Sequence, residues 1–218
     1  MAHDLVIVDY GMGNLRSVQK ALERLGVHAP ISSTPEDVEG AKAIVVPGVG
    51  AFGHAMAGLT ERKLLEPILR HVEAGRPYLG ICLGLQLLFE RSYEDGTHRG
   101  LGVLRGEVVR FPEAEGLKVP HMGWNQVWQC RPAPLFRGVS DGEWFYFVHS
   151  FFASPAEGDV VAGQTEHGVR FCSVVWKENV VACQFHPEKS QQAGLRLLEA
   201  FLRWAGVGPR DPVGQPDR

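Results

Sequence analysis

Short apolar runs alternate with helical patterns in the first half of the chain, and this alternation limits the fold more than any other feature. Residues 4–9 (DLVIVD), 41–48 (AKAIVVPG) and 76–82 (RPYLGIC) each have the length and composition of a strand buried on both faces. Residues 15–26 and 63–75 repeat apolar side chains at helical spacing, and each ends in a glycine that can cap a helix. Strands that alternate with helices predict a parallel sheet with helices on both faces.

The second half of the chain has a different pattern. Residues 102–111, 143–152 and 159–187 are predicted strands separated by glycine and polar turns, and residues 169–185 have the pattern of a hairpin turning at Lys177–Asn179. The expected fold class is therefore α/β, with a mostly parallel central sheet, helices on both faces, and an antiparallel section in the second half.

The chain ends in a helical pattern followed by a polar stretch. Residues 191–204 carry leucines on one helical face, and the segment after them is rich in proline and glycine. We expect one domain over residues 1–206 and a mobile tail over residues 207–218.

Composition excludes several classes of function. The net charge of −3 does not favour a nucleic-acid binder, and no apolar stretch approaches the roughly 20 residues that span a bilayer. The first residues lack the basic start and cleavage site of a signal peptide, so a cytoplasmic location is expected. The four cysteines have no CxxC pair and no metal-ligand spacing, and free thiols are expected in that compartment.

Cys82 lies between Gly80 and Gly84, where a strand pattern passes into an apolar helical pattern. The sequence GICLG has the shape of a nucleophile elbow with cysteine in place of serine. In such an elbow the nucleophile has a strained backbone, and the glycines leave room for close neighbours. The elbow places the thiol at a helix N-terminus, which favours the thiolate, and directs the Leu83 N–H toward an oxyanion. The same pattern also occurs where a helix simply packs tightly on a sheet.

A possible base for the thiol is found in the sequence HPE. Pro187 favours an extended His186, and in an extended chain His186 and Glu188 point to the same side. Glu188 can then orient one ring nitrogen while the other acts as a base, as in a catalytic triad. Gly48 and Gly50, which flank Val49, can present backbone N–H groups to a ligand as a second part of an oxyanion hole.

These three motifs together closely resemble the triad-type, class I glutamine amidotransferases. The sequences DYGMGNLRSVQKAL (residues 9–22), PGVGAFG (47–53), HMGWN (121–125) and FYFVHSF (145–151) are more specifically similar to the glutaminase subunits of imidazole glycerol phosphate synthase. The resemblance extends from Leu5 to Ala205 and implies the three-layer amidotransferase fold.

The resemblance also implies a role for each matching residue. Cys82 would attack the amide of glutamine, His186 would transfer protons, and Glu188 would orient the imidazole. The remaining positions are implied in groups: an oxyanion hole at Val49, Gly50 and Leu83, and a glutamine site at Gly50, Gln86, Ser150 and Phe151. Phe151 stands where a tyrosine is frequent in the family. No metal or organic cofactor is implied.

A partner is implied as well. In the family, a (β/α)8-barrel cyclase receives the ammonia through a channel and makes imidazole glycerol phosphate and an aminoimidazole carboxamide ribotide in histidine biosynthesis. The matching interface positions are Asn14, Trp124, Asn125, Tyr146 and Lys189. Trp124 and Tyr146 can also be read as core aromatics and Lys189 as a surface charge. His121 and His149, which fall in the same motifs, are interpreted as structural or interface residues.

Three alternatives remain open from the sequence. One is a glutaminase of the same fold that serves another synthase, such as anthranilate or GMP synthase. Another is a dinucleotide-binding protein, suggested by Gly11-Met12-Gly13, although Arg16 stands where a third glycine is needed. The last is a non-enzymatic α/β protein related to small cysteine-elbow stress proteins, which would not require His186 and Glu188.

Overall fold

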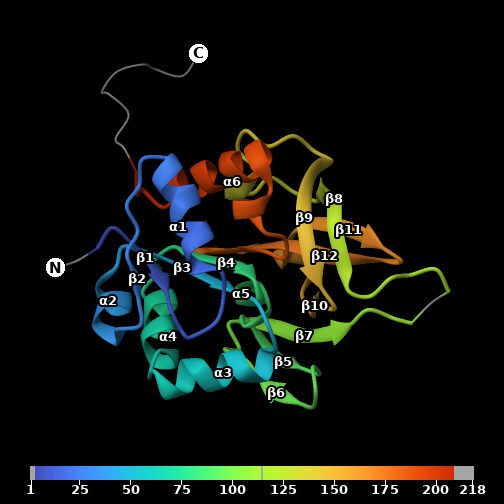
Figure 1. The fold of residues 1–218 in the computed structure, drawn as a ribbon, viewed down its shortest axis with the longest axis horizontal. Coiled ribbons are helices and arrows are strands. Elements are labelled where there is room, and N and C mark those ends of the chain that lie inside the picture. Colours follow the sequence, from blue (N-terminus) through green and yellow to red (C-terminus); the bar gives the residue numbers. More distant parts are fainter. Residues whose placement is uncertain (1–2, 114, 209–218) are drawn as a thin grey trace.

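The computed structural model describes residues 3–113 and 115–208, and its first half alternates strands and helices (Figure 1). In chain order this half contains β1 (Leu5–Val8), α1 (Leu15–Arg24), β2 (Ile31–Ser32), α2 (Pro35–Gly40), β3 (Ala43–Gly48), α3 (Phe52–Glu61), α4 (Leu65–Glu73), β4 (Tyr78–Cys82) and α5 (Leu83–Gln86).

The second half is mostly strands. It contains β5 (Phe89–Ser92), β6 (His98–Arg99), β7 (Leu104–Arg110), β8 (His121–Gln129), β9 (Glu143–His149), β10 (Phe151–Pro155), β11 (Val161–His167), β12 (Val169–Lys177), β13 (Val180–Cys183) and α6 (Gln191–Trp204). Short 3-10 turns cover Pro134–Phe136, Gly158–Val160 and Pro187–Lys189.

The strands form one extended sheet in the order β2-β1-β3-β4-β13-β12-β10-β7-β5-β6. Neighbouring strands from β2 to β13 are parallel, and β12, β10 and β7 continue the sheet with antiparallel pairing. A second antiparallel group, β11-β8-β9, branches from β12. The predicted α/β class, with a parallel part and an antiparallel section, is confirmed.

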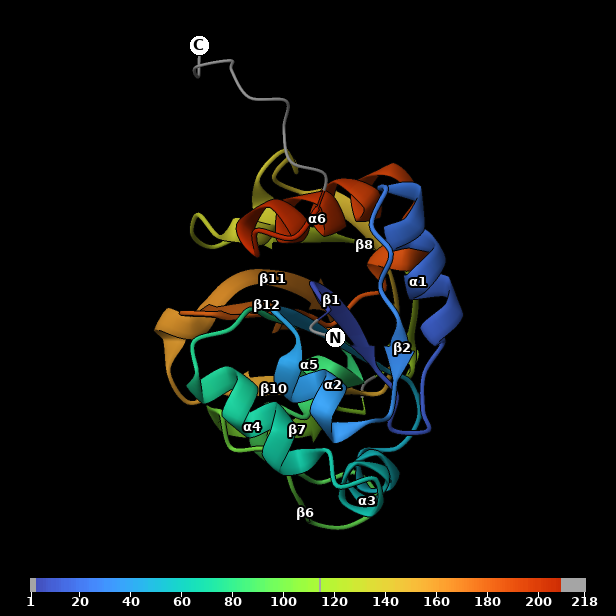
Figure 2. The same cartoon turned by 90° about the vertical axis from the view of Figure 1, so that its left-hand side faces the viewer.

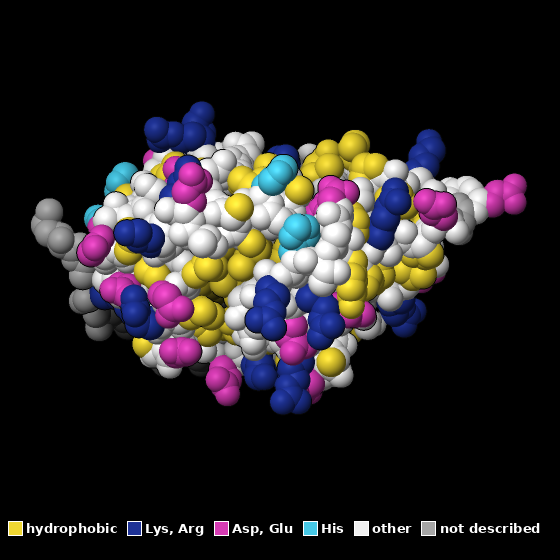
Figure 3. All heavy atoms as spheres, turned by 90° about the horizontal axis from the view of Figure 1, so that it is seen from below, with side chains coloured by type: hydrophobic (Ala, Val, Ile, Leu, Met, Phe, Trp, Pro, Cys, Tyr) yellow, Lys and Arg dark blue, Asp and Glu magenta, His cyan; other side chains and the backbone are white. Residues whose placement is uncertain are grey.

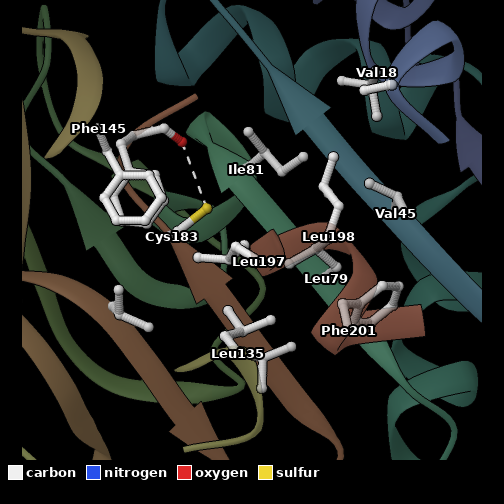
Figure 4. Packing of buried hydrophobic residues seen from close by; sticks show 14 of the residues in the cluster. Val18, Val45, Leu79, Ile81, Leu135, Phe145, Cys183, Leu197, Leu198 and Phe201 are labelled. Atoms are coloured by element: carbon white, nitrogen blue, oxygen red, sulfur yellow. Dashed lines mark hydrogen bonds between the residues drawn. The ribbon is translucent and has the colours of Figure 1, made fainter. Parts of the chain in front are cut away.

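Helices cover both faces of the parallel part, as Figure 2 shows: α1 and α6 lie on one side, and α2, α3 and α4 on the other. The side chains of β1 alternate accordingly, since Leu5 and Ile7 pack with α1 and α6 while Val6 and Val8 pack in the opposite core. Figure 4 shows Leu79 of β4 beside Phe201 of α6 in the first of these cores. Burying each such side chain fully contributes about 1.5–3 kcal/mol.

Some sequence predictions need correction. The apolar pattern after Cys82 is helical only to Gln86, and the chain then returns to the sheet as β5. Residues 143–152 form two strands rather than one, because the chain changes neighbours at Ser150: β9 pairs with β8, whereas β10 pairs with β7 and β12.

The predicted hairpin is confirmed as β12 and β13, with Lys177 paired to Val180. The final helix also has the predicted bounds. Apart from Val207 and Gly208, the tail predicted to be mobile lies outside the described residues.

The surface carries charges of both signs. On the face shown in Figure 3, basic and acidic side chains are intermixed rather than gathered into a patch of one sign. Among residues 3–113 and 115–208, no helix is both long and apolar enough to cross a bilayer.

Candidate active site

Cys82 has a strained backbone at the junction of β4 and α5. Its φ of +55° and ψ of −105° are rare for a residue with a side chain and cost of the order of 1–3 kcal/mol. A Cβ at Gly84 would lie 1.7 Å from the Val46 carbonyl oxygen, and one at Gly80 would lie 2.5 Å from the Gly84 carbonyl oxygen. The prediction that the two glycines provide clearance around a sharp elbow is therefore confirmed.

The elbow lies where three parallel strands end. In the sheet register, Gly48 at the end of β3 is opposite Cys82, and Cys183 at the end of β13 is opposite Ile81. Carboxyl ends of parallel strands are the usual location of sites in open α/β sheets. The residues that follow β13 therefore emerge next to Cys82, although they are about 100 positions later in the chain.

His186 and Glu188 form a buried pair at this edge. His186 Nδ1 lies 2.8 Å from Glu188 Oε1, and both side chains are 2% exposed. His186 is extended, as predicted, but Pro187–Lys189 form a 3-10 turn, so an extended segment over all three residues was wrong. The turn still places the carboxylate beside the imidazole, because the chain reverses direction immediately after His186.

Hydrogen bonds from two elements hold this turn. The His186 N–H donates to the Tyr146 carbonyl of β9 at 2.9 Å. The Ser190 hydroxyl donates to the His186 carbonyl at 2.6 Å and accepts from the Tyr146 N–H at 3.0 Å. A Cβ at Gly194 of α6 would lie 1.8 Å from the Pro187 carbonyl oxygen, so the helix also packs directly against the turn.

The charge state of His186 is set by its neighbours. Burial lowers the pKa of the imidazole, but Cys82 and the Glu188 carboxylate outweigh burial and raise the pKa of His186 to about 10. Cys82 raises this pKa both as a hydrogen-bond partner and through its charge, and Glu188 does so in the same two ways. Nε2 is buried, and no described residue lies within the distance and angle of a formed hydrogen bond to it. The arrangement favours the imidazolium form of His186.

The glycine-rich loop after β3 lies directly beside the elbow. Val49 is 38% exposed and Gly50 has a φ of +105°, while Leu83 is buried at the start of α5. A Cβ at Gly50 would lie 2.4 Å from Met12 Cε, so the loop packs against the segment that follows β1.

Tyr10 supports the Val49–Gly50 loop by contacting the end of β3, and sequence reasoning did not predict this role. Its hydroxyl donates to the Pro47 carbonyl at 2.8 Å, and a Cβ at Gly48 would lie 2.0 Å from that hydroxyl oxygen. Burial, with a smaller contribution from Cys82, raises the pKa of Tyr10 far above its usual value, so the hydroxyl stays a donor. The sequence signals were its position at the end of a buried strand and its place in the motif at residues 9–22.

The structure brings together two of the residues predicted to hold glutamine. Gln86 Nε2 donates to the Phe151 carbonyl at 2.9 Å. Ser150, which precedes Phe151, accepts a hydrogen bond from the Phe111 N–H through its carbonyl at 3.1 Å. Gln184 also contacts Gln86 and Cys82 and was not predicted; its place two residues before His186 was the available signal.

Three of the predicted interface residues form a cluster beside the turn over residues 186–189. Trp124 is 43% exposed and meets the Tyr146 ring edge-on at 6.1 Å, and Lys189 Nζ lies 5.8 Å from that ring. The Asn125 side chain turns inward and bonds to His121 Nε2 and the Glu166 carbonyl. Asn14 is exposed at the start of α1.

His121 and His149 are buried and hydrogen-bonded to each other, which agrees with a structural role. His121 Nδ1 lies 3.0 Å from His149 Nε2, and His149 Nδ1 lies 2.8 Å from the Phe151 carbonyl oxygen. Burial lowers the pKa of His121 to about 4 and that of His149 to about 3. Among the described residues, no group of three or more His, Cys, Asp or Glu side chains is arranged to hold a metal ion.

Comparison with known proteins agrees with this geometry. The sequence profile of the family described as glutamine amidotransferase class-I matches residues 6–204. Imidazole glycerol phosphate synthase subunit HisH of Syntrophotalea carbinolica is 56% identical over 202 residues, which cover 90% of this chain and 98% of that protein. The subunit HisH of Aquifex aeolicus is 53% identical over 92% of this chain and 96% of its own.

A solved structure described as a glutamine amidotransferase has a TM-score of 0.72 at 26% identity, over 93% of this chain and 99% of that one. The fold, the matched profile and the relatives agree: the chain belongs to the class I glutamine amidotransferases and, within them, to the family of imidazole glycerol phosphate synthase subunits HisH.

Proposed function

We propose that this protein hydrolyses glutamine to glutamate and ammonia through Cys82, His186 and Glu188. One observation carries the proposal: a strained cysteine and a buried His186–Glu188 pair meet at the carboxyl ends of β3, β4 and β13. A structural thiol has no need of this arrangement, because a core cysteine packs equally well in a relaxed backbone. The proposed domain extends over residues 1–206.

The chemistry follows from the charge states. The Cys82 thiolate attacks the side-chain amide carbon of glutamine, and backbone N–H groups of Leu83 and the Val49–Gly50 loop stabilise the oxyanion. The imidazolium of His186 donates a proton to the leaving nitrogen, which departs as ammonia and leaves a thioester on Cys82. His186 then takes a proton from water, which attacks the thioester, and glutamate is released.

Glu188 supports both steps from the far side of the ring. Its carboxylate accepts the Nδ1–H bond, which fixes the tautomer so that Nε2 faces the thiol. The same contact stabilises the imidazolium that exists before ammonia leaves. Gln86 and the Phe151 backbone, which are joined by a hydrogen bond, are proposed to hold the substrate together with Gly50 and Ser150.

We further propose that the ammonia passes to a partner, a (β/α)8-barrel cyclase that makes imidazole glycerol phosphate in histidine biosynthesis. The relatives are named as subunits of a synthase, which supports a partner chain. The cluster of Trp124, Tyr146 and Lys189, together with Asn14 and Asn125, is the proposed contact region. It adjoins the turn that carries His186, so a partner bound there would be close to the released ammonia. The location proposed for the complex is the cytoplasm, and the four free cysteines are compatible with it.

The test is synthesis of imidazole glycerol phosphate by the purified complex with a candidate barrel subunit, using either glutamine or ammonium as nitrogen source. Cys82→Ala should lose glutamine-dependent synthesis and retain ammonium-dependent synthesis. Cys130→Ser, which changes an exposed free thiol, is the matched control and should retain both. Retained glutamine use by the Cys82 variant would overturn the proposed nucleophile, and loss of both activities would point to a damaged complex.

The Val49–Gly50 loop suggests that the partner controls the rate of glutamine turnover. Val49 is exposed between two glycines, one with a positive φ, so its peptide can change orientation at little cost. We propose that its N–H reaches the oxyanion site fully only in the complex. Glutamine turnover should then be much slower for the isolated chain than for the complex, and equal rates would rule this out.

A further inference from the structure

Gln184 is a buried polar residue that the proposed reaction leaves without a role. Its side chain is fully buried, directly after β13 and beside the elbow. Burying an amide is costly unless its donors and acceptor are paired, so its partners indicate why it is there. The structure gives it two partners, and both belong to the candidate active site.

A short chain of hydrogen bonds connects Gln184 to the thiol. Gln184 Nε2 lies 3.6 Å from Cys82 Sγ, within the range of a bond to sulfur. Its Oε1 lies 3.2 Å from Gln86 Nε2, which also donates to the Phe151 carbonyl at 2.9 Å. Three side chains are thus linked to one fixed backbone oxygen.

The Phe151 carbonyl sets the direction of the whole chain. A carbonyl can only accept, so the nitrogen of Gln86 must face it. That nitrogen then needs an acceptor from Gln184, so the oxygen of Gln184 must point toward Gln86. The remaining NH2 group of Gln184 is left facing the sulfur. Neither amide can be reversed without placing two donors or two acceptors against each other.

The Phe151 carbonyl is itself held in place. The Phe151 carbonyl accepts a second bond from His149 Nδ1 at 2.8 Å, and His149 is in turn bonded to His121. A donor aimed at sulfur stabilises a thiolate more than a thiol, because bonds to charged acceptors are the stronger ones.

We propose that Gln184 is a positioning residue for the thiolate of Cys82. Its Nε2–H donates to the sulfur and favours the charged nucleophile. Its Oε1 occupies one N–H of Gln86, whose other N–H is held by Phe151, and this directs the Gln86 oxygen to the substrate. This role deepens the proposed glutaminase function and rests on that proposal. The contact between Gln184 and Cys82 can nevertheless be tested without glutamine.

The experiment is alkylation of the isolated full-length chain by iodoacetamide as a function of pH, in a Cys130→Ser background. Peptide mass spectrometry reports the modification at Cys82 separately from that at Cys172 and Cys183. Gln184→Met keeps the length of the side chain and removes the donor. We expect the midpoint of its pH profile to rise by about one unit, with about tenfold slower alkylation near neutral pH and an unchanged plateau at high pH.

Gln184→Glu provides a second variant of the same shape. Its carboxylate still accepts from Gln86 but directs negative charge at the sulfur, so the midpoint should rise further than in Gln184→Met. If the Met variant does not fold, the Glu variant alone decides the question. The matched control is Gln19→Met, which removes another buried amide whose Nε2 donates to the Ala29 carbonyl at 2.9 Å, and it should leave the profile unchanged.

The alternative results are distinct. A profile that coincides with that of the parent protein would overturn the proposal, and so would an equal loss of rate at every pH, since that indicates altered packing or access. Failure of glutamine turnover in the complex, with the shifted alkylation profile intact, would contradict the proposed function and leave the contact with the thiol established.

Discussion

At the scale of single residues, strain is concentrated on Cys82. Cys82 has a side chain at a backbone conformation that suits glycine. Movement of the neighbouring Gly80 and Gly84 cannot relieve this strain, because both are packed against backbone atoms. Such strain persists only where the surroundings fix it, and here it fixes the thiol at the carboxyl end of β4. The sheet and the elbow therefore hold Cys82, the proposed nucleophile, in place before any substrate arrives.

The strain at Cys82 predicts that glycine is more stable than alanine at this position, which is the reverse of the usual order in a strand. Cys82→Gly and Cys82→Ala both remove the thiol, but only glycine accepts a φ of +55° without cost. We expect the glycine variant to have a free energy of unfolding about 1–2 kcal/mol higher than that of the alanine variant in urea denaturation. In ordinary strands glycine is the less stable choice, so Ala182→Gly in β13 is the control and should be destabilising. A glycine variant less stable than the alanine variant would mean that the elbow is not strained.

Glu188, together with Cys82, raises the pKa of His186, which gives a second prediction. Glu188→Gln removes one of the two groups that raise the pKa of His186 to about 10, so that pKa should fall in a histidine NMR titration. A raised pKa stabilises the folded state fully below the unfolded pKa of about 6.5 and loses that effect as the pH rises through 10. The stability difference between the parent and the variant should therefore shrink as the pH approaches 10. An unchanged His186 titration would contradict the pairing.

At the scale of elements, α6 supports the turn over residues 186–189. The backbone of Pro187 approaches Gly194 so closely that no side chain fits between them. The turn is held from the other side by Tyr146 of β9, through its backbone and Ser190. The position of the Glu188 side chain therefore depends on how α6 and β9 pack against this turn.

Enlarging Gly194 tests this support. Gly194→Ala places a Cβ 1.8 Å from the Pro187 carbonyl oxygen and should force the helix and the turn apart. We expect a loss of about 1–3 kcal/mol in urea denaturation and slower alkylation of Cys82, because the His186–Glu188 pair is displaced. Gln192→Ala, at an exposed position of the same helix, should change neither quantity. An unaffected Gly194 variant would show that the contact can relax freely.

At the scale of the whole molecule, much of the site could be predicted from local sequence. The elbow glycines, the partner of His186 and the β12–β13 hairpin depend on neighbours in the chain, and short-range rules describe them. Strand order does not follow from local sequence. The placement of β13 beside β4 is what brings Gln184 and His186 to Cys82, and it is decided by packing among distant segments.

The residues that were missed share this cause. Tyr10 and Gln184 act through contacts with residues 37 and 102 positions away. The short length of α5 is also a tertiary effect, since β5 leaves the helical pattern to pair with β7. Apolar periodicity can predict burial, but it does not specify which neighbour ends a helix.

The final prediction concerns stability in acid. Burial lowers the pKa of His71, His121 and His149 to about 4, about 4 and about 3. Below pH of about 6.5 the unfolded chain binds protons at these sites and the folded chain does not, so stability should fall as the pH drops from about 6.5 to 4. Each such site adds about 1.4 kcal/mol per pH unit to the slope of the free energy of unfolding.

His71→Gln isolates one of these sites, because it lies apart from the active site in α4 and bonds the Pro77 carbonyl through Nε2. Urea denaturation at a series of pH values should show a slope reduced by about 1.4 kcal/mol per unit near pH 5, relative to the parent protein. Between pH 7 and 8 the two slopes should coincide, since both folded and unfolded imidazoles are then mostly neutral at this position. Parallel curves through pH 5 would mean that His71 titrates normally in the folded protein.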